Sequence, residues 1–449
     1  MDPQEQKFIR MTQTPVAPLI AKLAVPCIIS MLVTAFYNMA DTYFVGQLDS
    51  TAATAAVGAV FSVMAVIQAV GFFFGQGSGN YISRCLGSKQ YEDASVMAAT
   101  GFLSALAVGT LICLLGQVFL EPLCWLLGAT DTMMADTKAY LQVILLGAPW
   151  MVSSYVLNNQ LRFQGGAMYA MVGITTGAVL NIILDPLLIL PQFGNLGVAG
   201  AGWATIVSQF ISFCILLTGT SRGDNIRIRI RNFRFSFHYY RWIFKGGLPS
   251  LARQCLASLA TICLTHSAKP YGDAAIAAMG VVQRITMFGA SAMLGFGQGF
   301  QPVCGFNYGA KLYSRVKEGF WFCVKVASAF LTVTAVAGFL FAEPLITLFR
   351  DDPAVIEFGV AALRFQCITF PVQAWIVSSN MLQQSIGRTV PATFLSVARQ
   401  GLFFIPMVLI MPLFLDKAGI QMAQSAADLL TFLCALPIQL RVLKTLERS

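Results

Sequence analysis

Twelve long apolar stretches constrain this chain more than any other feature of its sequence. Each has about the 20 residues that an α-helix needs to cross a bilayer. Only 11% of the 449 residues are charged, whereas soluble domains contain about 25%. We therefore predict an all-α integral membrane protein with twelve transmembrane helices. The stretches lie near residues 17–45, 52–80, 94–118, 136–158, 166–190, 198–219, 240–266, 274–304, 318–341, 355–381, 390–414 and 419–440.

The basic residues predict the orientation of the chain in the membrane. If the N-terminus is cytoplasmic, nineteen of the 29 Lys and Arg residues fall in cytoplasmic segments, six lie within spans, and four lie outside: Lys138, Lys269, Arg350 and Lys417. Such a bias is typical of cytoplasmic loops. Both termini are thus predicted to be cytoplasmic, and the net charge of +9 indicates contact with membrane lipids rather than nucleic acid.

An internal repeat predicts two six-helix lobes. With a shift of 222 residues and no gap, Phe74-Gly-Gln-Gly77 falls on Phe296-Gly-Gln-Gly299, and Pro149 falls on Pro371. Because six is even, both lobes run the same way through the bilayer and are related by a pseudo-twofold axis along the membrane normal. The expected organisation is an N-lobe at 1–221, a basic cytoplasmic linker at 222–239 and a C-lobe at 240–449.

An acidic residue in the middle of the fifth span marks a candidate ion site. Asp185 costs about 2.5–3.5 kcal/mol at the centre of a membrane helix, so such residues usually serve a function. Asn181 lies one helical turn before it and faces the same side. Pro186 frees the carbonyl of Ile182 from the helix. Two side chains and a carbonyl on one face predict a site for a proton or a small cation; the alternative is a structural partner for a basic residue.

Two further residues join this candidate site. Asp41 lies in the first span, which Pro26 is expected to kink; the alternative is that Asp41 lies in water near the outer helix end. Thr205 of the sixth span would add a hydroxyl, unless it bonds to its own helix backbone. A Na⁺ ion would fit the oxygens of Asp41, Asn181, Asp185 and Thr205 as well as a proton would.

The second half of the chain has a different set of intramembrane charges. Asp428 lies in the last span and Arg399 in the span before it, and we expect them to form a structural ion pair. Arg253 and Arg284 lie in the seventh and eighth spans, in which the sequence places no acidic residue. No HExxH, Walker A or GxSxG pattern occurs, so the sequence favours a transporter rather than an enzyme.

Over nearly its full length the chain resembles the multidrug and toxic compound extrusion (MATE) family. The resemblance rests on the plan of six plus six helices and on four motifs. These are Pro26 with Asp41, Asn181-x-x-x-Asp185-Pro186 followed by Gly197 to Thr205, the run from Gly297 to Lys311, and its counterpart at Ser83 to Gly87. One branch of that family also uses acids in the seventh and eighth spans, so the resemblance points to the MepA/DinF-like branch.

The resemblance implies a secondary antiporter that exports small organic, mostly cationic, drugs in exchange for H⁺ or Na⁺ by a rocker-switch mechanism. It implies a multi-pass protein of the bacterial cytoplasmic (inner) membrane, with Asp41, Asn181, Asp185 and Thr205 carrying the coupling ion. No cofactor is expected, and a monomer suffices. The aromatic residues expected to form the walls of the drug cavity are Phe36, Tyr37, Tyr155 and Trp203. The alternative is a lipid or metabolite exporter of related architecture. The sequence leaves the drug range and the choice of ion open.

Overall fold

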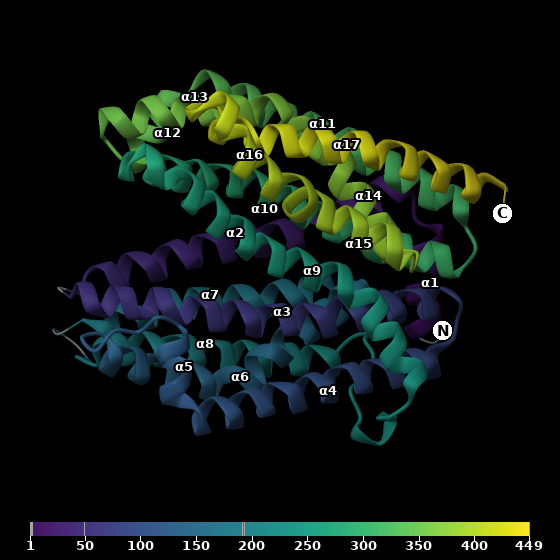
Figure 1. Ribbon diagram of the computed structural model, residues 1–449. Helices are drawn as coiled ribbons and strands as arrows, with labels where there is room; N and C mark the ends of the chain where they lie inside the picture. The colour runs from purple at the N-terminus through teal and green to yellow at the C-terminus, as the bar shows by residue number, and fades with distance from the viewer. Residues whose placement is uncertain (1–2, 49, 191, 193, 449) are drawn as a thin grey trace. The chain divides into compact units, whose positions relative to one another are not determined.

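The computed structural model describes residues 3–48, 50–190, 192 and 194–448. Over these residues it has helices and no strand, and twelve helical segments are long and apolar enough to cross a membrane, as predicted (Figure 1). The first six are α2 (Val16–Gly46), α3 (Thr51–Gly87), α4 (Tyr91–Val118), α6 (Met134–Phe163), α7 (Ala167–Ile189) and α8 (Gly197–Thr220).

The other six spans follow a basic segment that contains a short turn, η1 (Ile230–Asn232). They are α9 (Phe237–Ala268, extended by η2, Lys269–Tyr271), α10 (Asp273–Gly309), α11 (Tyr313–Leu340), α13 (Pro353–Thr369) with η3 (Phe370–Val372) and α14 (Gln373–Ser385), α15 (Thr389–Val397) with η4 (Ala398–Phe404) and α16 (Ile405–Leu415), and α17 (Lys417–Arg448). Three short helices lie outside the spans: α1 (Pro3–Gln13), α5 (Leu120–Leu126) and α12 (Ala342–Phe349).

The chain divides into two compact units. Unit 1 contains Met1–Arg10 and Ile29–Gly247, and unit 2 contains Met11–Ile28 and Leu248–Ser449. The division falls inside α1, α2 and α9. In α2 and α9 it lies close to Pro26 and Pro249, which are within those helices. The expected lobe limits, 1–221 and 240–449, remain a prediction.

In unit 1, α6 packs against α3, α4 and α8, and α7 packs against α8 (Figure 1). Three glycines spaced by four residues let α3 approach α6, because a methyl group at any of them would overlap an α6 side chain. The facing pairs are Gly71 with Tyr155, Gly75 with Asn159 and Gly79 with Phe163.

α3 ends at Gly87 rather than near residue 80 as predicted. Its last turns are rich in polar side chains, which lower the local hydropathy, but these side chains bond to neighbouring helices. Gln76 Nε2 donates to Asn159 Oδ1 at 3.1 Å, and Gln160 Nε2 donates to Ser78 Oγ at 3.0 Å. Buried polar groups with such partners do not end a helix.

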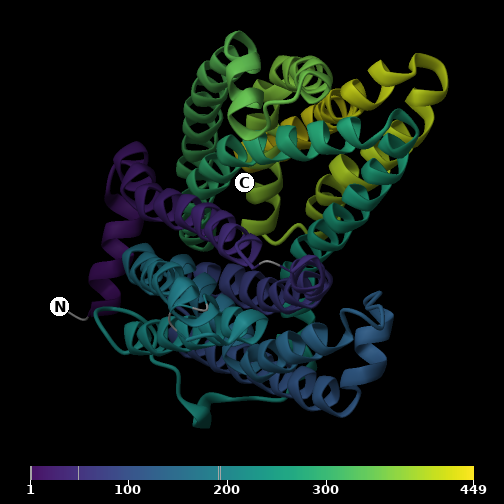
Figure 2. The same ribbon diagram turned by 90° about the vertical axis from the view of Figure 1, so that its left-hand side faces the viewer.

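In unit 2, α10 packs against α11 and α13, while α17 packs against α13 and α16 (Figure 1 and Figure 2). Two of its spans are not regular α-helices. The 3₁₀ turn η3 interrupts the tenth span at Pro371, and the π-helical segment η4 occupies the middle of the eleventh. Pro149, the repeat partner of Pro371, lies instead inside the continuous helix α6.

Candidate functional site

Asp185 is the most buried acidic residue of the candidate site in unit 1. It lies on α7 with an exposed fraction of 0%, and Asn181, one turn earlier, is 2% exposed. Pro186 lies inside the same helix and has no N–H to donate to the carbonyl of Ile182. The face of α7 expected from the sequence is therefore turned into the protein.

The amide of Asn181 links Asp185 to α8. In the orientation that satisfies both neighbours, Asn181 Nδ2 donates to Asp185 Oδ2 at 3.0 Å, and its oxygen accepts from the Thr205 N–H at 3.2 Å. In the opposite orientation the amide oxygen would face the carboxylate, and Nδ2 would reach only Thr205 Oγ1, at 3.4 Å. The first orientation gives Asp185 Oδ2 a donor, which a buried carboxyl oxygen needs.

Asp41 completes the cluster from α2, in the part of that helix that belongs to unit 1. Its carboxyl group is partly buried and lies within hydrogen-bonding reach of that of Asp185. One oxygen of each group, Oδ1, is buried without a donor among the described residues. Two acceptor oxygens that face no donor are an arrangement that a proton or a hard cation would satisfy.

Thr205 and two tyrosines surround the carboxyl groups. Thr205 Oγ1 donates to the Ala201 carbonyl of its own helix at 3.0 Å, so this residue reaches Asn181 through its main chain. Tyr37 and Tyr140 are buried close enough to both carboxyl groups to interact with them electrostatically. Sequence reasoning missed Tyr140 because nothing in its own span distinguishes it.

A small cavity of about 50 Å³ in unit 1 has Tyr37 and Tyr155 in its wall, together with polar residues that include Ser154 and Gln209. Phe36 and Trp203 do not line it and are 56% and 41% exposed. Successive helical residues point about 100° apart, so Phe36 turns away from the side that Tyr37 faces. The role of these four aromatic residues stays a prediction.

Unit 2 contains a second polar cluster, centred on Asp428, which shares no residue with the site in unit 1. Arg399 Nε donates to Asp428 Oδ1 at 2.7 Å, so the two residues singled out in the sequence form an ion pair. Asp428, which is 1% exposed, also accepts from Gln424 Nε2 at 3.0 Å and Gln373 Nε2 at 2.8 Å. The carboxylate thus has three donors.

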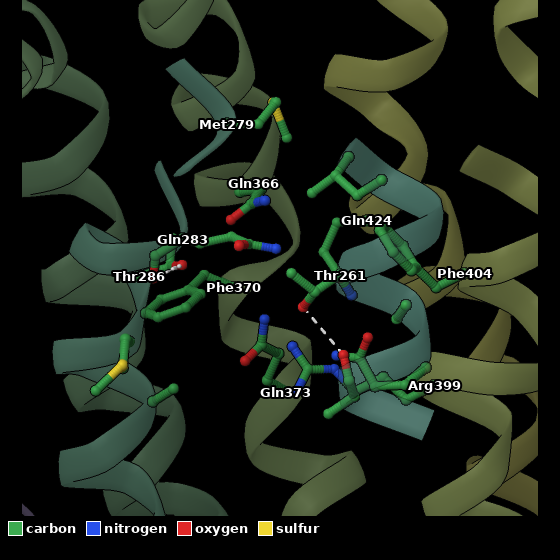
Figure 3. A pocket seen from close by; sticks show the side chains of 16 residues that line it. Thr261, Met279, Gln283, Thr286, Gln366, Phe370, Gln373, Arg399, Phe404 and Gln424 are labelled. Atoms are coloured by element: carbon green, nitrogen blue, oxygen red, sulfur yellow. Dashed lines mark hydrogen bonds between the residues drawn. The ribbon is translucent and has the colours of Figure 1, made fainter. Parts of the chain in front are cut away.

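A cavity of about 210 Å³ lies beside this ion pair. Figure 3 shows Gln283, Gln366, Gln373 and Arg399 gathered around it, from α10, α13, α14 and η4, with Thr261 of α9. Periodicity within one span could not predict this cavity, because its wall is assembled from five spans.

The MatE family model matches residues 26–187 and 249–410. The multidrug export protein MepA of Staphylococcus aureus (strain MRSA252) is 26% identical over 437 residues, 97% of this chain and 96% of that protein. MepA of Staphylococcus saprophyticus is 27% identical over 417 residues, 92% of this chain and 91% of that protein.

Solved structures of MATE transporters have a similar fold over nearly the whole chain. A structure of MATE in the bent conformation is 25% identical with a TM-score of 0.90, and 98% of each chain is covered. An outward-facing multidrug resistance MATE transporter of the MOP superfamily is 24% identical with a TM-score of 0.92, covering 98% of this chain and 99% of that chain.

Proposed function

Because the chain belongs to the MatE family of transporters, we propose that it exports small organic, mostly cationic, drugs across the bacterial inner membrane in exchange for H⁺ or Na⁺. The observation that supports this proposal best is the pair of carboxyl groups of Asp41 and Asp185, each with a buried oxygen that faces no donor among the described residues. The relatives called multidrug export protein MepA support drugs as the substrate class.

Electrostatics gives the carboxyl pair its coupling role. Two neighbouring carboxylates in a region of low dielectric repel each other strongly, so the pair favours one bound proton or one cation. Asn181 holds Asp185 in place, and the Thr205 N–H holds Asn181. A proton or Na⁺ that enters the pair removes negative charge, which weakens the attraction for a cationic drug, and this competition is the basis of antiport.

The aromatic wall is suited to a lipophilic cation. Tyr37 and Tyr155 line a cavity in unit 1, and Tyr37 also lies near the carboxyl pair. Aromatic faces attract organic cations by about 0.5–2 kcal/mol each. Phe36 and Trp203 belong to this proposal as further wall residues in another conformation of the transporter.

The transport cycle is proposed to be alternating access by rocking of the two lobes. Ion binding at Asp41 would change α2, the helix that also contains Pro26. The bias of basic residues supports cytoplasmic termini, and the protein is proposed to work as a monomer.

Drug efflux from proteoliposomes tests the function. Purified protein would be reconstituted with a fluorescent organic cation, and either a pH gradient or a Na⁺ gradient would be imposed. The native protein should export the dye under one of the gradients, while Asp185→Asn and Asp41→Asn should reduce driven export to the background. Asp131→Asn, an exposed loop variant, is the matched control and should behave as the native protein.

The results separate the proposals. The gradient that drives export identifies the coupling ion. Driven export that persists in both carboxyl variants would overturn the assignment of the site. Export of no cationic dye under either gradient would overturn the drug substrate and favour the lipid or metabolite exporter.

A further inference from the structure

Arg399 retains unused N–H donors after it forms its ion pair with Asp428. Its guanidinium group has five N–H donors, and the hydrogen bond to Asp428 uses the one on Nε. In the part of the chain that the structure describes, its terminal nitrogens have no other acceptor within hydrogen-bonding distance. The side chain is 25% exposed and lines the 210 Å³ cavity. A group in that cavity therefore meets unused N–H donors.

A second arginine lies close to Arg399. Both Arg253, from α9, and Arg399 line an adjoining cavity of about 230 Å³, and the two guanidinium groups repel each other. No acidic side chain among the described residues forms an ion pair with Arg253. The charged groups lining or bonded to the two cavities are thus two arginines and one aspartate, a net charge of +1 inside the membrane-spanning part of unit 2.

The remaining walls combine amides with apolar surface. Ala257, Arg399 and Gln400 line both cavities, so the two cavities adjoin at these residues. Amide groups of Gln283 and Gln366 offer both donors and acceptors. The apolar side chains of Met279, Leu264, Phe370 and Phe404 complete the wall of the first cavity.

The backbone that carries Arg399 and Gln400 is not a regular α-helix. Residues Ala398–Phe404 form a π-helical segment, which includes Arg399 and Gln400. Pro406 follows this segment and has no N–H to donate to the carbonyl of Leu402. The regular hydrogen-bond pattern is therefore interrupted next to the wider turn. Wider turns of this kind within α-helices are frequent at functional sites.

From these observations we propose that unit 2 contains a binding site for a small organic anion, separate from the ion site of unit 1. The carboxylate binds at Arg253 and the free side of Arg399, since guanidinium groups bind carboxylates through paired N–H donors. The apolar body of the ligand lies against Phe370, Phe404 and Met279. An unpaired cation in this region is otherwise costly, which a bound anion offsets.

The test compares a charged ligand with its neutral analogue. Benzoate and benzamide have nearly the same shape and differ in charge. Each would be titrated by calorimetry into the full-length protein in a neutral detergent, with no lipid added. We expect the Kd of benzoate to be at least about tenfold lower than that of benzamide, because only benzoate pairs with the arginines.

Two arginine variants locate the charge. Arg253→Gln should raise the Kd of benzoate about tenfold or more and leave benzamide unchanged. Arg364→Gln is the matched control, because Arg364 is an exposed arginine of unit 2 that donates to the Phe339 carbonyl at 3.3 Å; it should leave both ligands unchanged. Arg253→Lys retains the charge and should recover part of the affinity for benzoate. If Arg253→Gln fails to fold, the comparison of Arg253→Lys with the native protein still tests the proposal, because lysine cannot form the paired N–H donors of arginine.

Three results would overturn the proposal. One is equal binding of benzoate and benzamide, and another is an equal effect of Arg253→Gln and Arg364→Gln. The third concerns the source of the anion, for which dihexanoyl phosphatidylglycerol would be titrated in parallel. If this lipid binds in a manner that depends on Arg253 and benzoate does not bind, the site belongs to a lipid headgroup. Because these titrations need no gradient and no transport, their outcome is independent of the proposed export function.

Discussion

Asn181 Nδ2 lies 3.0 Å from Asp185 Oδ2, one helical turn away on α7. The same amide accepts from the main-chain N–H of Thr205 on α8. The position of the Asp185 carboxylate thus depends on a neighbouring helix through a single side chain. This chain of contacts assigns different roles to the amide of Asn181 and the hydroxyl of Thr205.

Asn181→Ala should therefore impair export more than Thr205→Val. The alanine variant leaves a buried oxygen of Asp185 without its donor, a loss of about 1–3 kcal/mol, so we expect gradient-driven dye export to fall about tenfold or more. In Thr205→Val the hydroxyl lost is one that donates to Ala201 of its own helix, so export should stay within about threefold of native. Proteoliposome efflux measures both. Equal loss in the two variants would show that the hydroxyl binds the ion.

The sequence predicts those features of this fold that depend on one span at a time. Hydropathy places the spans, and the 3.6-residue period puts Asn181 and Asp185 on one face. It does not predict that Tyr140 lies near the carboxyl pair, because contacts between spans depend on tertiary packing. Nor does it predict η4 or the break at Pro371, since Pro149 occupies the equivalent position in the repeat and its helix continues.

The two partners of the Arg399–Asp428 ion pair should differ in their contributions to stability. Asp428 is 1% exposed and Arg399 is 25% exposed. Arg399→Gln leaves a buried carboxylate without a cation, at a cost of about 3–5 kcal/mol. Asp428→Asn leaves the more exposed arginine unpaired and should cost less. Thermal unfolding in detergent, without added ligand, should give the lowest Tm for Arg399→Gln.

The double variant and an exposed pair serve as controls for this prediction. Arg399→Gln with Asp428→Asn removes both charges and should recover most of the Tm that Arg399→Gln loses. Lys138→Gln breaks the exposed pair with Glu121, 2.8 Å apart, and should leave the Tm nearly unchanged, because solvent screens exposed charges. A double variant no more stable than Arg399→Gln would contradict the prediction.

Gly77 should tolerate a methyl group far less well than Gly58, although both lie on α3. A Cβ at Gly77 would overlap the main-chain carbonyl of Ile243 on α9, whereas a Cβ at Gly58 meets no atom within 4 Å. Because a backbone carbonyl cannot rotate away, Gly77→Ala should destabilise the protein by about 1–3 kcal/mol. Gly58→Ala should stabilise it by up to about 1 kcal/mol, from helix propensity alone. Equal Tm values for the two variants would show that α9 shifts freely.

The attachment of α1 to unit 1 should strengthen as the pH rises. Lys7 is 1% exposed; its Nζ donates to the Asp224 carbonyl at 2.5 Å and lies 3.7 Å from Asp224 Oδ1. Burial lowers the pKa of Lys7 from 10.5 to about 8, although the charge of Asp224 acts in the opposite direction. Between pH 8 and 10.5, detached α1 retains a proton that attached α1 has released. Attachment therefore gains about 3 kcal/mol as the pH rises through this range and is constant below it.

Hydrogen exchange of residues 3–10, corrected for the intrinsic rate at each pH, measures this attachment. Protection of the native protein should rise between pH 8 and 10, because the proton is lost only when Lys7 is buried. Lys7→Met has no charge to bury, so its protection should not change over this range. Arg10→Gln removes an exposed ion pair with Asp224, 3.1 Å long, and should retain the rise. A rise of equal size in Lys7→Met would assign the effect to another group.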